Sequence, residues 1–195
     1  MVKSFAVLGF SLASIFLSNT AQADWQLNND KSKVSFVSIK NSSIAEVHYF
    51  NAVSGSLSEQ GNFKVNIDLA SVETMIPIRN QRMTEFVFET VKYPKASLHA
   101  DLSKQLPQLK AGQHTLKEVS AELNFHGEQK QISTDVLVNV SQDGDITVSS
   151  LSPLIINAAD FSVTEGIATL QKLAGLSAIA TAVPVSYSLT LEKAH

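Results

Sequence analysis

Two arginines and an asparagine are the residues of this chain whose types and spacing most suggest ligand binding. Arg79, Asn80 and Arg82 lie within an apolar and aromatic stretch, residues 74–98. A guanidinium group offers two parallel N–H donors, which suit an anionic or carbonyl headgroup. The simpler interpretation is a solvated helix edge, or an exposed salt bridge to a carboxylate such as Asp160, which would add little stability. The residues alone leave both interpretations open.

Other polar groups show no catalytic arrangement. Asp160 lies between apolar residues and Phe161, where it can serve a ligand or simply cap a strand end. The five histidines have no metal-ligand spacing, although neighbouring strands can bring a pair such as His114 and His126 together. The sequence contains no HExxH, GxSxG, P-loop or GxGxxG motif. It also contains no cysteine, which excludes a thiol nucleophile, a disulfide and a cysteine-ligated metal. We therefore expect no cofactor.

The stretch 74–98 is expected to form a short helix inserted between strands. Pro77 suits a first helical turn, and Tyr93-Pro94 opposes further helix. One helical face is predicted by the spacing of Met83, Phe86, Val87 and Val91. This insert is expected to cover one end of a sheet, with cations at its edge.

Most of the remaining chain alternates between apolar and polar residues, which is typical of strands with one buried face. The pattern predicts strands at 25–39, 47–57, 63–69, 96–102, 119–125, 132–140, 146–156 and 183–191. A change of face near Val37 suggests a bulge, and Asp143-Gly144 predicts a hairpin. About eight antiparallel strands indicate either a barrel or a sandwich. A barrel of that size is wide enough for one elongated ligand.

The segment 165–180 is a second departure from strand alternation. Ser162 and Glu165 match a capping box, and helical spacing relates Ile167, Leu170, Leu173, Ala174 and Leu176. It is expected to be either a crossover helix packed on a sheet or a second cover over a hydrophobic cavity.

The first 23 residues predict a secretory signal peptide. Lys3 precedes a short apolar run, 5–17, and Ala21-Gln22-Ala23 fits a cleavage site. The run is shorter than the roughly 20 residues that span a bilayer, so a permanent membrane anchor is not expected. The mature domain would be 24–195, in the periplasm. Its acidic balance, with 18 Asp and Glu against 15 Lys and Arg in the full chain, does not suit nucleic-acid binding.

Several motifs follow one another in order: Ser32-x-Val34-x-Phe36, Gly55, Thr74…Arg79-Asn80…Phe86…Tyr93-Pro94, Leu123-x-Phe125-x-Gly127 and Asp160-Phe161. Over residues 24–193 they resemble the YceI-like lipid- and polyisoprenoid-binding family of bacterial periplasmic proteins. The resemblance implies an extended lipocalin-like barrel, an apolar tunnel for an isoprenoid or similar amphiphile, and no catalysis. Departures from the family are Lys31 and Lys40 in place of histidines, and His48 and Ser162 in place of glycines. The tunnel mouth is therefore expected to differ from that of its relatives.

The combined expectation is a mainly β protein, an extended antiparallel eight-stranded lipocalin-like barrel with one or two short helices. Its partner would be a long-chain isoprenoid or other amphiphilic lipid, bound for transport, storage or sequestration. The expected ligand-binding residues are Phe36, Phe63, Arg79, Asn80, Phe86, Phe88, Phe125, Asp160 and Phe161. One alternative is an enzyme in which Arg79 and Asp160 perform an acid–base step. Another is a filled barrel that serves as adaptor for a membrane partner. An exposed edge strand beside the opening offers a route to a homodimer.

Overall fold

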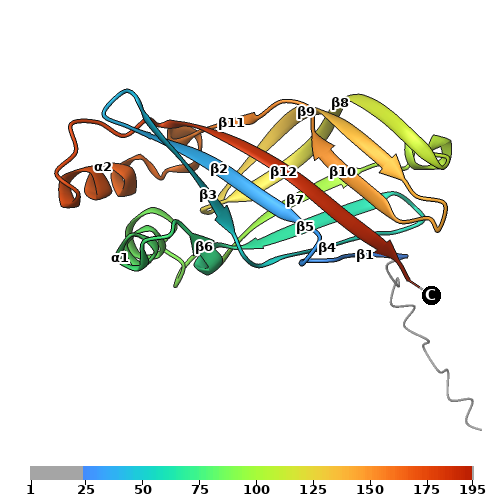
Figure 1. Cartoon of the computed structure of the whole chain (residues 1–195), viewed down its shortest axis with the longest axis horizontal. Helices are drawn as coiled ribbons and strands as arrows, with labels where there is room; N and C mark the ends of the chain where they lie inside the picture. Colours follow the sequence, from blue (N-terminus) through green and yellow to red (C-terminus); the bar gives the residue numbers. More distant parts are fainter. Residues whose placement is uncertain (1–23, 195) are drawn as a thin grey trace, which may run out of the picture.

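The computed structural model describes residues 24–194, so the predicted signal peptide lies outside the described residues. The chain forms a long barrel with the helices α1 and α2 at one end (Figure 1). Its strands are β1 Trp25–Leu27, β2 Lys33–Lys40, β3 Ile44–Phe50, β4 Val53–Leu57, β5 Asn62–Asp68, β6 Val72–Glu73, β7 Lys95–Asp101, β8 Gly112–Phe125, β9 Glu128–Val140, β10 Ile146–Ser150, β11 Leu154–Asn157 and β12 Ala182–Lys193. The helical elements are η1 Leu69–Ser71, α1 Pro77–Arg82, η2 Met83–Val87, η3 Leu106–Gln108, η4 Ala158–Phe161 and α2 Thr164–Leu173.

Antiparallel pairing closes the sheet into a ring. The order is β1, β4, β5, β7, β8, β9, β10 and β12, and β12 pairs with β1 again. β2 and β3 continue the ring toward the helical end, where β2 pairs with β12 and β3 pairs with β2. The eight-stranded antiparallel barrel is therefore confirmed, and the sandwich is excluded.

Three of the predicted strands are interrupted. The stretch 25–39 divides into β1 and β2 at a turn in which the Asn28 side chain accepts a hydrogen bond from the Lys31 backbone N–H. The stretches 47–57 and 146–156 each divide into two strands as well, the second near Pro153, which cannot donate to a ladder. Each interruption lets the two halves pair with different parts of the barrel.

The bulge predicted near Val37 is wrong. β2 and β3 pair without a break from Val34–Phe50 to Lys40–Ile44, so residue 37 simply faces outward in regular alternation. A register shift occurs instead between β8 and β9, between Leu116 and Val119.

The 74–98 insert is helical, as expected, but shorter and less regular than the pattern suggested. α1 begins at Pro77 and continues directly into η2, a turn of π-helix. Met83 and Val87 are buried, whereas Val91 is fully exposed beyond the end of the helix. The helical face therefore extends over only the first part of the predicted pattern.

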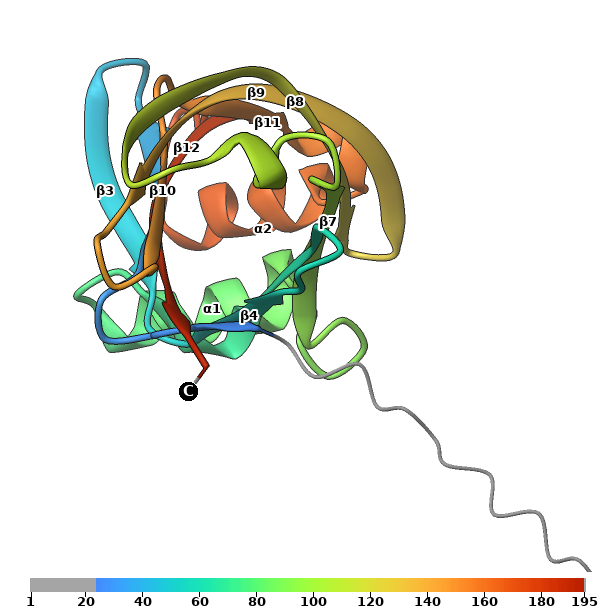
Figure 2. The ribbon, with the colours of Figure 1, turned by 90° about the vertical axis from the view of Figure 1, so that its right-hand side faces the viewer.

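The second helix, α2, begins without the predicted capping box. Ser162 adopts a left-handed conformation with φ of 56°, and its hydroxyl donates to Glu128 rather than to the helix N-terminus. The helix ends at Leu173, and the chain continues as a loop against β2, where the Ala180 N–H donates to the Ile39 carbonyl. Figure 2, which looks along the barrel from the opposite end, shows α1 and α2 across the far end of the ring.

Candidate functional site

The inward faces of the strands enclose a cavity of about 580 Å³. This volume lies within the range of small-molecule binding pockets. Its wall is almost entirely apolar and extends from Leu57, Val138 and Leu191 at one end to Phe36, Phe88 and Val163 near the helices. A barrel filled by its own side chains would have no such space, so the structure does not support the alternative of a filled barrel that serves as adaptor.

The link between β7 and β8 lies across the end of the cavity away from α1 and α2. Leu102, Gln105, Leu106 and Leu109 line the cavity there, and η3 crosses this end of the ring in Figure 2. The leucines pack against the main core cluster around Val138 and Leu191. An elongated ligand is therefore expected to enter from the helical end.

The opposite end opens between the two helical segments. Ile76 and Ile78 line the cavity and are also 43% and 51% exposed, so the apolar wall reaches the outer surface there. We define the mouth as the lining residues at this end: Lys40, Ile76, Ile78, Arg79, Arg82, Ala174 and Leu176.

α2 and η2 form a joined cover beside the mouth. Gly166 lies directly against the backbone of η2, where a Cβ atom would overlap the carbonyl oxygen of Phe86. Only glycine allows the two backbones to approach this closely. Ile167 and Leu170 of α2 then line the cavity. The segment 165–180 is therefore a second cover over the cavity, rather than only a crossover helix.

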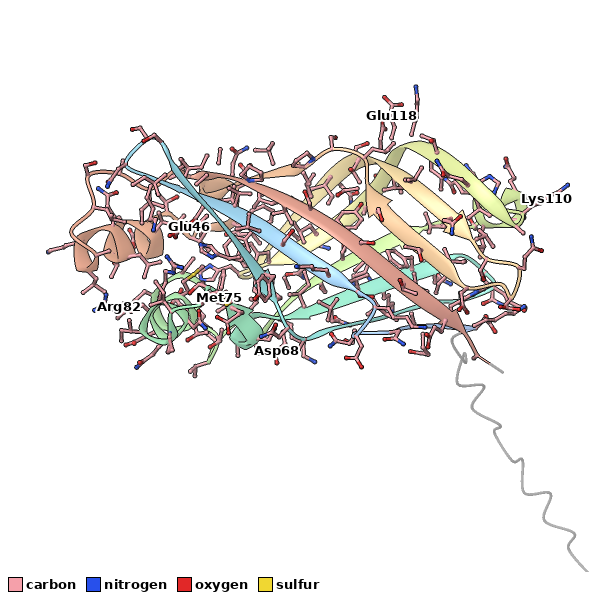
Figure 3. The ribbon with its side chains drawn as sticks, viewed as in Figure 1. Glu46, Asp68, Met75, Arg82, Lys110 and Glu118 are labelled. Carbon is pink, nitrogen blue, oxygen red and sulfur yellow. The ribbon has the colours of Figure 1, made fainter. Side chains whose placement is uncertain are left out.

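Two of the three cations at the mouth, Lys40 and Arg79, meet at Glu46. Its Oε2 atom lies 2.7 Å from Lys40 Nζ and 2.6 Å from an Arg79 guanidinium nitrogen. The hydrogen bond from Lys40, assisted by Arg79, holds the pKa of Glu46 below its ordinary value, although partial burial opposes this. Arg82 extends from the helical end in Figure 3. Within residues 24–194 it forms no ion pair. Arg82 is therefore the guanidinium most free to meet a ligand.

Arg79 itself is largely occupied. Besides Glu46, its guanidinium group donates to the Thr74 carbonyl oxygen. These bonds connect α1 to β3 and to the segment before the helix. Asn80 is occupied in the same way, since its side chain accepts from the Thr74 backbone N–H at 2.9 Å and donates to Glu73. Both residues hold the insert in place, which the sequence could not reveal.

His48 is a buried polar residue in the cavity wall. Its Nε2 atom lies 2.8 Å from Ser38 Oγ, and its Nδ1 atom has no hydrogen-bond partner among residues 24–194. Burial lowers the pKa of His48, and the positive charge of Arg79 lowers it further; Lys40 acts in the same direction and Glu46 in the opposite one. The imidazole is therefore held neutral near neutral pH.

We expect His48 to make the protein less stable in mild acid. Its pKa in the folded protein lies below the ordinary 6.5. As the pH falls from the ordinary value through the lowered pKa of the folded protein, the unfolded chain binds more protons than the folded protein, so the free energy of unfolding decreases. Urea unfolding between about pH 7 and pH 5 should show this slope, and His48→Gln should reduce it.

Glu46 provides the control for this prediction. Its lowered pKa contributes stability that is lost only in a lower window, below its ordinary 4.5. An unchanged slope between about pH 7 and pH 5 in His48→Gln would assign the acid sensitivity to other groups.

The structure divides the predicted site residues into two groups. Phe36, Phe63, Phe88 and Phe125 lie on the cavity wall, and Arg79 lies at the mouth. The remaining four predicted residues, Asn80, Phe86, Asp160 and Phe161, do not line the cavity. Phe161 is buried behind the wall, 5.5 Å from the Phe125 ring, and Phe86 is only half-buried.

Asp160 and the histidines do not assemble a reactive centre. Asp160 is exposed in η4, and within residues 24–194 its side chain has no hydrogen bond or ion pair, so it does not meet Arg79. His114 lies near the start of β8, and His126 follows its end, so the two do not meet. His126 Nε2 instead lies 2.7 Å from Glu89 Oε2. In the part of the chain that the structure describes, no group of three or more histidine, aspartate or glutamate side chains is placed to hold a metal ion.

The sequence singled out Lys40 and His48 as departures expected to alter the mouth, but neither was among the expected ligand-binding residues, and both line the cavity. A usable signal was present for Lys40. Val34, Phe36, Ser38 and Lys40 are two residues apart, and a strand places such residues on one face. His48 carried the same signal, because it is two residues before Phe50, which also lines the cavity.

The comparisons with known proteins agree with this geometry. The model of the YceI-like domain matches residues 25–191. A polyisoprenoid binding domain from Saccharophagus degradans, implicated in plant cell wall breakdown, is 38% identical with a TM-score of 0.84, over 89% of this chain and 100% of that domain. No curated protein sequence matches the chain.

Two more distant structures share the fold. BcnA of Burkholderia cenocepacia is 22% identical with a TM-score of 0.62, over 84% of this chain and 98% of its own. The YCEI protein of Campylobacter jejuni is 18% identical with a TM-score of 0.52, over 99% of this chain and 100% of its own.

Proposed function

The chain belongs to the YceI-like family, and from this premise we propose that it binds a long-chain isoprenoid or similar amphiphilic lipid inside its barrel. The observation that carries the proposal is the closed barrel with its apolar cavity of about 580 Å³. Burial of apolar surface is the main source of affinity in such a cavity. A binding protein, rather than an enzyme, is the activity that this family membership favours.

The proposed orientation places the hydrocarbon chain toward η3 and the polar headgroup at the mouth. The chain would lie against the wall formed by Phe36, Phe63, Phe88 and Phe125, and the headgroup would meet Arg82 and Lys40. Because Glu46 neutralises one of the cations at this end, the remaining positive charge favours an anionic or carbonyl headgroup. Arg79 would act mainly by holding α1 in position.

The biological part of the proposal is export followed by transport, storage or sequestration of the lipid in the periplasm. This depends on the signal peptide predicted for residues 1–23, and it stays a prediction. None of the described helices is long and apolar enough to cross a membrane. A homodimer also stays a prediction; β3 pairs with β6 only at Tyr49 and Phe50, which leaves the edge at 44–48 unpaired among the described strands.

Native mass spectrometry of the full chain, purified from an exporting bacterial host, tests the function. A bound lipid should appear as a defined mass increment. In a series of isoprenoid alcohols, each added CH₂ should improve affinity by about 0.8 kcal/mol, or roughly fourfold, until the cavity is full. Affinity that stays constant across the series would contradict binding inside the barrel.

A further inference from the structure

Large apolar side chains are exposed around the mouth. Ile44, Ile76, Ile78 and Leu173 are 49%, 43%, 51% and 46% exposed. We call these residues the rim patch. Ile76 and Ile78 belong to the mouth, Ile44 pairs with Lys40 of the mouth, and Leu173 directly precedes Ala174. The apolar surface of the cavity thus continues onto the outside of the protein.

The opposite end of the barrel has a different surface. The described links there, residues 58–61, 102–111 and 141–145, contain no exposed large hydrophobic side chain. Both ends are built from loops and short helices, so the contrast does not follow from the type of element. Exposed apolar residues that are gathered at one functional opening are typical of an interaction surface.

The charges at the mouth indicate that the partner surface is anionic. Lys40, Arg79 and Arg82 line it, and the exposed Lys172 adjoins Leu173. Glu46 pairs with two of these cations, and Glu165 lies at the far end of α2 from Lys172. Glu73 and Glu85 add negative charge beside α1 and η2, but the residues that line the cavity include three cations and no carboxylate. Apolar side chains around such a cationic opening suit the interface of an anionic lipid bilayer.

We propose that the rim patch docks the mouth onto an anionic bilayer, so that lipid passes between the membrane and the cavity without entering water. The proposal rests on the function proposed above. Each methylene group exposed to water disfavours a free lipid about fourfold, so a long chain does not leave a bilayer readily unless the receiving cavity is in contact with it. The protein would lie on the surface through its rim and would not span the membrane.

The test compares two double variants in vesicle flotation. Ile44→Gln with Leu173→Gln removes apolar surface from the rim without changing the cavity wall, because neither residue lines it. The control is Leu151→Gln with Ile155→Gln on the outer side of the barrel, where the exposures are a similar 49% and 52%. The vesicles contain phosphatidylethanolamine with a minority of phosphatidylglycerol, or phosphatidylcholine alone.

The rim variant should bind the anionic vesicles about tenfold more weakly than the parent, and transfer of a fluorescent isoprenoid from them should slow to a similar degree. The control should behave as the parent. The parent should bind phosphatidylcholine vesicles less well, and salt should weaken its binding to anionic vesicles. Equal vesicle binding by the rim variant and the parent would overturn the proposal, as would an equal loss in both variants.

Solution binding of a water-soluble short isoprenoid alcohol separates this proposal from the function on which it rests. The rim variant should bind that probe with the parent's affinity, and matching melting temperatures would show that both variants are folded. A parent that floats with vesicles but binds no isoprenoid in any assay would overturn the proposed function and still support the docking surface.

Discussion

Ala121→Phe should abolish binding of long-chain lipids while the barrel remains as stable as the parent. Ala121 is buried in β8, lines the cavity and pairs with Ile132, which lines it as well. A phenyl ring there would extend into existing space, so it avoids most of the cost of overpacking a filled core. It would displace the hydrocarbon chain. Loss of about four methylene contacts corresponds to about 3 kcal/mol, or more than about 100-fold in affinity.

Ser120→Phe is the matched control, because Ser120 is the exposed neighbour on the outer face of the same strand. This variant should bind lipid as the parent does. Isothermal titration with a long-chain isoprenoid, together with a thermal melt of each variant, measures both quantities. Undiminished binding by a folded Ala121→Phe protein would show that the lipid lies outside the barrel.

Phe88→Asp should destabilise the protein severely, whereas Phe86→Asp should have a small effect. Phe88 is only 6% exposed, lines the cavity, and packs against the rings of Phe50 and Phe125 at 5.8 and 6.1 Å. Loss of a buried phenyl group costs about 3–5 kcal/mol, and a carboxylate in an apolar wall adds to this. Such a loss is a large part of the roughly 5–15 kcal/mol that stabilises a typical domain.

Phe86 differs because it is half-buried and does not line the cavity. A charged residue there can reach water, so we expect a loss below about 2 kcal/mol and retained lipid binding. Urea unfolding of both variants provides the comparison. Phe88→Leu, which keeps the site apolar, should lie much closer to the parent than Phe88→Asp does. Equal destabilisation by the two aspartate variants would mean that the wall is assigned incorrectly.

The sequence by itself determined most of the strands, the helical insert and the family. Strict alternation in 63–69 and 183–191 corresponds to β5 and β12, since a period of two places successive side chains on opposite faces. Asp143-Gly144 does lie in a hairpin, although in a loop of five residues, 141–145. The resemblance to the YceI-like family, carried by motifs such as Tyr93-Pro94, is confirmed by the match over residues 25–191. These features are local, or depend only on the order of residues along the chain.

Only the tertiary structure decided between barrel and sandwich, because closure depends on the pairing of β1 with β12, which are far apart in the sequence. It likewise showed that Phe88 lines the cavity and Phe86 does not. It also showed that Arg79 is bonded to Glu46 and Thr74 and is not free to clamp a ligand. The predicted cap at Ser162 failed because that hydroxyl bonds to Glu128 of β9. Apart from Thr74, which is five residues before Arg79, the decisive partners come from distant parts of the chain. Local pattern specifies which faces are apolar, but long-range packing specifies which of the apolar residues surround the cavity and which polar groups remain free at its mouth.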